Sequence, residues 1–164
     1  MPTRKDAIVQ RLLQERPFAG DSSDPRIRYN RRWMFLYYLS GIGMTLYNTY
    51  RHTLVIDDYR LLFEHLVRRD GFEIQHDAEV PIYFGEDILE GATKRINLLV
   101  TGNIIVMLYR QDTIGDDERH ALESLLTLTH LSYGFIGNFD NDQFYSEWYA
   151  RDTKTAAIER IRLM

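Results

Sequence analysis

The sequence contains no cysteine and only four prolines in its 164 residues. The absence of cysteine excludes disulfides and thiolate metal sites. The first six residues hold no apolar stretch of the kind found in a secretory signal, so we expect the cytoplasm or another reducing compartment. Hydrophobic residues make up 45% and charged residues 27%. These fractions are typical of a globular chain that forms one domain with a real core.

Common catalytic motifs are also missing. The sequence has no G-x-S-x-G elbow, no phosphate-binding glycine-rich loop and no HExxH motif. None of the five histidines lies four residues from another. The scattered carboxylates of the second half are typical of a solvated acidic surface. We therefore predict neither a metal site nor a cofactor.

The formal net charge of −4 argues against a general nucleic-acid binder, but the charge is unevenly distributed. Residues 1–51 hold nine Lys and Arg against four Asp and Glu, and the remainder holds eleven against twenty. This asymmetry is compatible with a solvated basic helix face. It also permits a contact between the N-terminal arm and an acidic partner or phosphate, but we favour the solvated face.

Apolar periodicity and helix-ending residues predict the secondary structure. Thr3 is expected to cap the first helix with Asp6 at the capping-box position, and Asp57 or Asp58 and Asp116 are expected to cap two later helices. Residues 155–163 suit either a helix or a strand. The predicted helices span residues 4–16, 29–53, 57–69 and 116–130, and the predicted strands span residues 73–75, 79–84, 95–100, 104–109 and 133–137.

Two segments rich in β-branched and aliphatic residues, Arg95–Val100 and Ile104–Tyr109, are joined by the short turn Thr101-Gly102-Asn103. This pattern predicts a β-hairpin. Because side chains alternate along a strand, Ile105, Met107 and Tyr109 should share one face of the second strand.

The hairpin resembles the core hairpin of the GxxExxR proteins, a branch of the PD-(D/E)xK nuclease superfamily. The pattern of that family runs R-A-D-L-hydrophobic, a turn, then I-V-E-L-K. In this sequence Asn97 stands where the family has Asp, Met107 where it has Glu, and Tyr109 where it has Lys. Ala121 stands where the following helix usually has Gln.

The resemblance extends from about Tyr59 to Phe139. Segments similar to those of the family, in the same order, are Gly71–Gln75, Val80–Phe84, Arg119–Leu131 and Tyr133–Phe139. The opening motif of the family matches either Gly41–Leu54 or Tyr59–Phe63. The resemblance implies an α/β fold, a small mixed sheet flanked by helices. Three parts are expected: a basic, aromatic-rich helical extension at 1–56, the nuclease-like core at 57–140, and a C-terminal tail at 141–164 packed on that core.

The four departures from the family pattern bear on whether this protein can cleave nucleic acid. In the family the Asp and Glu hold a divalent metal, which needs hard oxygen ligands, and the Lys helps to position the attacking water. Asn97 offers a neutral oxygen, Met107 a thioether and Tyr109 no ammonium group. The resemblance therefore implies a degenerate site, and we predict that the protein is not an enzyme. The old cleft would have become apolar core or a binding surface.

The segment from Trp33 to Tyr50 has no charged residue and is near the lower length limit for a membrane span. Its glycines and hydroxyl side chains favour a buried or partner-facing helix over membrane contact. We predict a structural or accessory subunit that docks on a protein partner, or on a second copy, through the two N-terminal helices. The predicted interface residues are Trp33, Phe35, Tyr37, Tyr38, Arg28, Arg31 and Arg32.

Two alternatives remain open. A basic arm of Arg26, Arg28, Arg31 and Arg32, with its aromatic neighbours, suits binding of nucleic acid without cutting. The other alternative is a metal-dependent nuclease with a rearranged site.

Overall fold

The computed structural model describes residues 3–15 and 31–161. The helices are α1 (Arg4–Glu15), α3 (Arg31–Tyr50), α4 (Ile56–Arg69) and α5 (Asp116–Thr129). The strands are β1 (Ile74–Phe84), β2 (Asp87–Val100), β3 (Ile104–Tyr109), β4 (Tyr133–Phe139), β5 (Phe144–Arg151) and β6 (Ile158–Ile161). The expected α/β class is confirmed.

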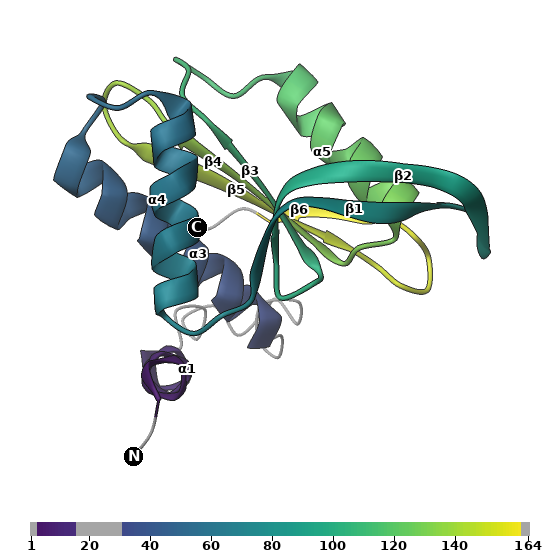
Figure 1. Cartoon of the computed structure of the whole chain (residues 1–164), viewed down its shortest axis with the longest axis horizontal. Coiled ribbons are helices and arrows are strands. Elements are labelled where there is room, and N and C mark those ends of the chain that lie inside the picture. Colours follow the sequence, from purple (N-terminus) through teal and green to yellow (C-terminus); the bar gives the residue numbers. More distant parts are fainter. Residues whose placement is uncertain (1–2, 16–30, 162–164) are drawn as a thin grey trace.

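The six strands form one mixed sheet whose spatial order follows the chain from β1 to β6. β3 and β4 are parallel and are joined by the crossover helix α5, whereas every other neighbouring pair is antiparallel. Figure 1 shows α3 and α4 on one side of the sheet and α5 on the other. This layering leaves β4, in the middle of the sheet, buried along its whole length.

Alternation along β3 divides the apolar side chains between two cores, as predicted. Val106 and Leu108 point into the first core, with side chains of α3 and α4. Ile105 is buried in the second core with Leu122 of α5, and Met107 and Tyr109 pack against it. A one-residue shift of β3 would exchange these two sets, so burial of both faces fixes the register.

The helix starts agree only partly with the predicted caps. The Asp6 backbone N–H donates to Thr3 Oγ1 over 3.1 Å and the Thr3 N–H donates to the Asp6 carboxylate over 3.2 Å, which confirms the predicted capping box. The predictions for Asp57, Asp58 and Asp116 are wrong. These carboxylates lie inside the first turns of α4 and α5, where they favour the helix through its dipole instead.

β1 and β2 are longer than the strands predicted there, and they form a hairpin that projects from the body of the molecule (Figure 1). The sequence shows no alternation of apolar and polar residues over 87–94, so it predicts no strand there. The structure gives the reason: most of these side chains are exposed on both faces of the strand. Pairing with β1 holds them in the sheet, with an irregularity between Pro81 and Tyr83.

The C-terminal residues complete the sheet. β5 pairs with β4 along its whole length and contributes Trp148 to the first core, and β6 pairs with β5. Residues 158–161, left open between helix and strand by the sequence, are therefore a strand. Within the described part of the chain, no helix has both the length and the apolar character that a membrane crossing requires.

Candidate functional site

The four positions singled out from the family resemblance lie around β3. Met107 and Tyr109 are partly buried on the face of β3 that packs against the second core, and Ala121 is partly buried on α5. Asn97 of β2 is exposed, next to Leu98, which pairs with Val106. The Tyr109 hydroxyl lies 4.0 Å from the Met107 sulfur. These neutral or soft groups do not fit a hard divalent cation.

Two charged residues that the sequence did not single out flank the end of β3. Arg60 of α4 donates from Nη2 to the Leu108 carbonyl oxygen over 3.1 Å and forms an ion pair with Asp57. Glu118 of α5 lies on the other side. Burial raises the pKa of the Tyr109 phenol, the negative charge of Glu118 raises it further, and Arg60 opposes the shift. Burial therefore has the largest effect on the pKa of Tyr109, and the charges of Glu118 and Arg60 act on it in opposite directions.

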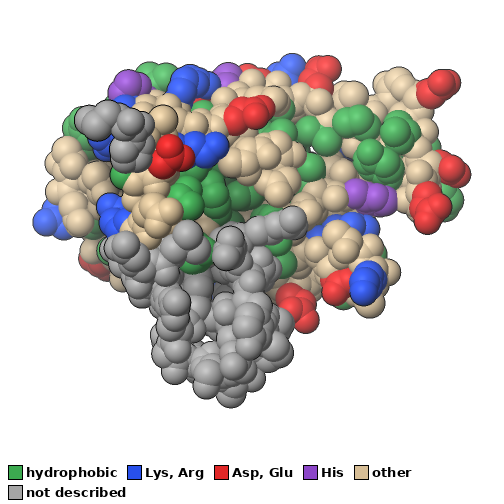
Figure 2. Space-filling model, turned by 90° about the horizontal axis from the view of Figure 1, so that it is seen from below, with side chains coloured by type: hydrophobic (Ala, Val, Ile, Leu, Met, Phe, Trp, Pro, Cys, Tyr) green, Lys and Arg blue, Asp and Glu red, His purple; other side chains and the backbone are tan. Residues whose placement is uncertain are grey.

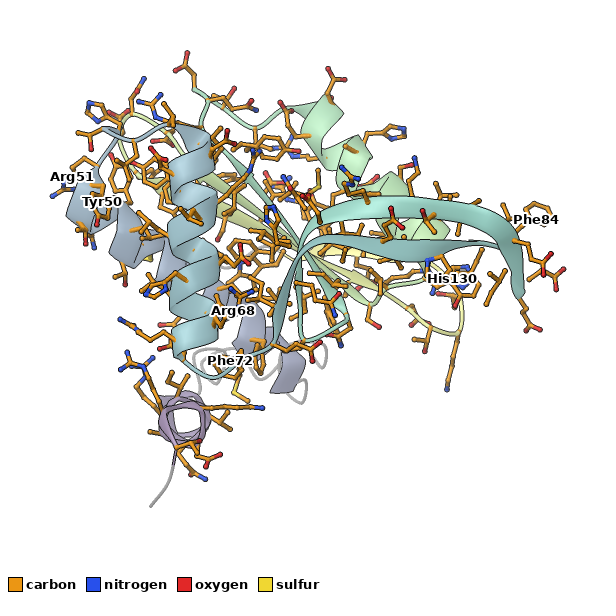
Figure 3. The ribbon with its side chains drawn as sticks, viewed as in Figure 1. Tyr50, Arg51, Arg68, Phe72, Phe84 and His130 are labelled. Atoms are coloured by element: carbon orange, nitrogen blue, oxygen red, sulfur yellow. The ribbon has the colours of Figure 1, made fainter. Side chains whose placement is uncertain are left out.

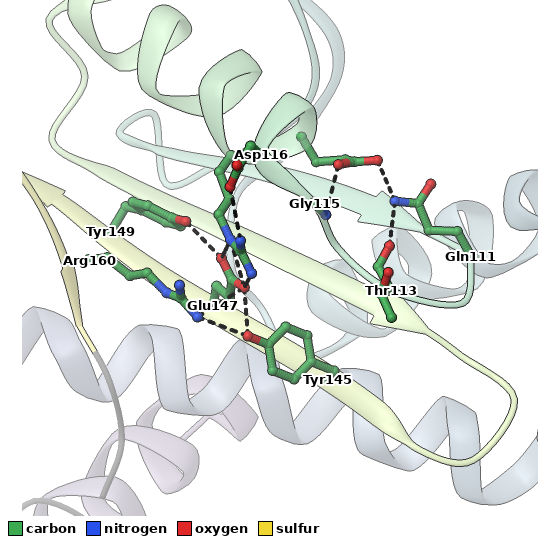
Figure 4. Close-up of polar contacts among 10 residues, drawn as sticks. Gln111, Thr113, Gly115, Asp116, Tyr145, Glu147, Tyr149 and Arg160 are labelled. Carbon is green, nitrogen blue, oxygen red and sulfur yellow. Dashed lines mark hydrogen bonds and ion pairs between the residues drawn. The ribbon is translucent and has the colours of Figure 1, made fainter.

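The loop between β3 and α5 is tied to β4 by Asn138. Its side chain accepts the backbone N–H of Gln111 over 3.0 Å and donates to the Gln111 carbonyl oxygen over 2.8 Å. The Gln111 side chain donates to Glu118 over 2.5 Å and to the carbonyl oxygen of Thr113 (Figure 4). Glu118 also accepts the N–H of Gly115. The hydrogen bond from Gln111 is the main reason that the pKa of Glu118 is lowered.

A buried polar cluster lies on the same face of the sheet, two strands away (Figure 4). Glu147 of β5 is buried and accepts hydrogen bonds from the hydroxyls of Tyr145 and Tyr149 over 2.6 and 2.7 Å. Arg119 of α5 contacts both of its carboxylate oxygens, and Arg160 of β6 lies 3.0 Å from one of them. Each carboxylate oxygen already accepts from at least two donors, so its hydrogen-bonding capacity is satisfied within the protein. These contacts hold α5, β5 and β6 together.

Ionisation of Glu147 reflects these contacts. Burial opposes its charge, but hydrogen bonds from Arg119, Tyr145 and Tyr149 outweigh burial and hold the pKa near 2. Burial and the hydrogen bond to Glu147 raise the pKa of Tyr149 in turn. Among the residues that the structure describes, no group of three or more histidines and carboxylates is arranged to hold a metal ion.

The aromatic side chains predicted as an interface divide between the inside and the outside of the fold. Tyr38 is buried and donates to Asp70 over 2.5 Å, and Phe35 packs edge-on against Phe72, 4.7 Å between ring centroids. Phe72 lies just beyond the end of α4 (Figure 3). Tyr37 is exposed. Arg28, like Arg26, lies outside the described residues, as do the side chains of Arg31, Arg32 and Trp33. The interface itself stays a prediction.

A cavity of about 390 Å³ opens between α1 and α3, close to Tyr37. Asp70 lies in its lining, where it accepts a hydrogen bond from Arg4 Nε over 2.5 Å and lies 3.4 Å from Arg69 Nη2. This cavity could not be predicted from the sequence, because it forms between side chains of α1 and α3 that are far apart in the chain. We call it the α1–α3 cavity; its lining is Arg4, Ile8, Arg11, Tyr37, Tyr38, Ser40, Gly41, Ile42, Met44, Thr45, Arg69 and Asp70.

Comparisons with known proteins place the sequence in a family. The family model of the PD-(D/E)XK nuclease superfamily matches residues 35–150. Among solved structures, the crystal structure of SSO0001 is similar over 87% of this chain and 75% of that chain, with 13% identity and a TM-score of 0.44. No curated protein matches the sequence.

The family match corrects one sequence prediction. We predicted from the four replaced positions that the protein is not an enzyme, but the superfamily that it matches is one of nucleases. The prediction treated the loss of particular side chains as loss of activity, and neither the match nor the fold shows such a loss. Because the match spans well over half of the sequence, this chain belongs to the PD-(D/E)XK nuclease superfamily.

Proposed function

We propose that this nuclease-like domain acts as a protein-binding subunit of a larger assembly. It docks through residues 82–90 at the end of the β1–β2 hairpin, which we call the hairpin tip. The observation that carries the proposal is the exposure of large apolar side chains there. Phe84 is 78% exposed, Ile88 56% and Leu89 44%.

The hairpin tip is apolar on both of its faces. Tyr83 pairs across the hairpin with Ile88, and Phe84 pairs with Asp87. Cross-strand partners share a face and successive residues alternate, so Phe84 and Ile88 point to opposite sides. Figure 3 places Phe84 at the far end of the molecule, pointing away from it, whereas His130 lies beneath the hairpin and stacks on Tyr83. A tip of this shape suits insertion into a groove.

The charge around the hairpin tip narrows the kind of partner. Residues 79–91 hold four carboxylates and no Lys or Arg. Figure 2 shows acidic side chains beside the apolar ones at this end of the molecule. A phosphate backbone would be repelled here. The tip therefore suits a protein groove that is apolar inside and cationic at its rim.

The test is affinity capture of the full chain from its own cells, followed by mass spectrometry and nuclease treatment. Wild type should retain a stoichiometric protein partner that survives the nuclease. Phe84→Asp should lose it. Leu61→Asp is the matched control, because Leu61 is also highly exposed but lies on α4. Equal capture by wild type and Phe84→Asp, or a partner that disappears with nuclease, would refute docking through the tip.

Family membership supports a second candidate, metal-dependent cleavage of nucleic acid at a rearranged site. The specific observation is that charged side chains flank the end of β3: Arg60 donates to the Leu108 carbonyl oxygen, and Glu118 accepts from Gln111 and Gly115. We would incubate the purified protein with single- and double-stranded DNA and RNA in Mg²⁺ or Mn²⁺. Cleavage should be lost in Glu118→Gln and kept in Glu90→Gln, whose side chain lies on the exposed hairpin. Cleavage that persists in both variants would point to a contaminant.

A further inference from the structure

The α1–α3 cavity complements the hairpin tip in charge and in apolar character. Three guanidinium groups and one carboxylate line the cavity, from Arg4, Arg11, Arg69 and Asp70. The hairpin tip carries Glu86, Asp87 and Glu90 and no Lys or Arg. Apolar surface is available on both sides, because Met44 is about half exposed at the cavity.

We propose that the hairpin tip of one copy docks in the α1–α3 cavity of a second copy, so that the protein self-associates head to tail. This inference rests on the proposed function, because it names the partner of the hairpin tip. The exposed Phe84 would enter the cavity beside Tyr37 and Met44, and Glu86 and Glu90 would face its guanidinium groups.

The positions of the two surfaces require a second copy. Figure 1 shows the end of the hairpin and α1 at opposite ends of the molecule, so one chain cannot place its own tip in its own cavity. The contact joins two different surfaces, and each copy keeps one free surface of each kind. Such a contact builds a ring or an open chain, rather than stopping at a symmetric dimer.

Pairing of tip with tip is disfavoured by charge. It would bring together two tips that each carry three carboxylates and no Lys or Arg. Pairing of tip with cavity joins opposite charges instead. Screening by salt should therefore weaken it.

The experiment uses the full chain and measures mass by light scattering and sedimentation over a range of protein concentrations. Wild type should form species larger than a dimer as concentration rises, and less so at high salt. Phe84→Asp should be monomeric because its tip is disabled. Met44→Asp should be monomeric because it places a carboxylate at the cavity. Leu61→Asp should assemble like wild type.

Mixing the two variants is the decisive step. Phe84→Asp keeps a working cavity and Met44→Asp keeps a working tip, so an equimolar mixture should form a one-to-one dimer that grows no further. Wild type that stays monomeric overturns the inference. So does a mixture without dimer, or self-association of Met44→Asp alone, which indicates pairing of tip with tip.

A second variant guards against misfolding. Glu86→Lys with Glu90→Lys changes only exposed side chains and should also abolish assembly. If Phe84→Asp loses a cellular partner while purified wild type is a monomer, self-docking is wrong and the proposed function stands. If purified wild type assembles through the tip and captures only its own copies in cells, self-docking is supported. The assembly is then a homo-oligomer, and the partner in the proposed function is a second copy.

Discussion

Arg119 and Glu147 join the crossover helix to the sheet through three close contacts. Arg119 Nε lies 2.9 and 3.1 Å from the two Glu147 carboxylate oxygens, and Arg119 Nη2 lies 2.8 Å from one of them. The two residues are 28 positions apart, on α5 and β5, so the contact closes the fold over a large loop. Arg160 of β6 and two tyrosines complete the shell around the carboxylate.

Removing Arg119 should destabilise the protein strongly. Arg119→Met leaves the buried Glu147 carboxylate short of its main cationic partner, which typically costs about 3 kcal/mol. Urea unfolding followed by circular dichroism measures the loss. Arg95→Met is the matched control, because Arg95 is exposed on β2, and it should change the unfolding free energy by less than about 0.5 kcal/mol. Equal losses in the two variants would show that the Arg119 contact adds little.

The ionisation of Glu147 predicts how stability depends on pH. Its folded pKa of about 2 is below its ordinary value of 4.5, so its contribution is complete above the ordinary value and is lost as pH falls toward 2. The shift corresponds to about 3 kcal/mol. Wild type should therefore be more stable than Glu147→Gln at neutral pH, with the gap narrowing between about pH 5 and pH 2. A gap that is constant over this range would contradict the lowered pKa.

Two glycines of α3 should respond in opposite ways to alanine. A Cβ at Gly43 would overlap the Phe144 ring, whereas a Cβ at Gly41 would meet nothing within 4 Å. Gly41→Ala should stabilise by about 0.5–1 kcal/mol through helix propensity. Gly43→Ala should destabilise by about 1–3 kcal/mol, because the Phe144 ring is wedged between α3 and Gly137. Thermal melting compares the two, and stabilisation by both would show that the ring moves freely.

Restoring the family residues tests whether the metal-site geometry is inherited. Asn97→Asp with Met107→Glu and Tyr109→Lys should lower stability without metal, because Met107 packs against the second core and a carboxylate there is costly to bury. Mn²⁺ should then raise the melting temperature of this triple variant and leave wild type unchanged. Met107→Glu alone is the control. It should lose stability like the triple variant, but Mn²⁺ should not raise its melting temperature. A triple variant that Mn²⁺ does not stabilise would show that the geometry has diverged.

Local patterns predicted much of the fold. The two faces of β3 followed from strict alternation of Ile105, Val106 and Met107, and the start of α1 followed from the spacing of Thr3 and Asp6. Gly71 follows the end of α4 and has a left-handed backbone, which glycine adopts without strain. The two candidate segments for the opening motif of the family lie on different elements. Tyr59–Phe63 lies on α4, which leads into the sheet, whereas Tyr50–Leu54 spans the end of α3 and the turn after it.

Other features depended on partners that the sequence does not identify. The exposed half of β2 carries no apolar alternation, and only its ladder with β1 makes it a strand. Glu147 reads as one surface carboxylate among many in an acidic segment, yet it is buried between Arg119 and Arg160. No spacing rule connects three side chains from α5, β5 and β6.

The sequence by itself determined the hairpin of β2 and β3 and the chemical character of the side chains at its family positions, because these depend on local period and residue type. The α/β class followed from the resemblance of several sequence segments, in order, to a known family. The tertiary structure decided which aromatic side chains are buried, where Glu147 finds its cations, and that the hairpin tip and the α1–α3 cavity lie at opposite ends. These features arise from contacts between residues far apart in the chain, whose energies no local pattern records.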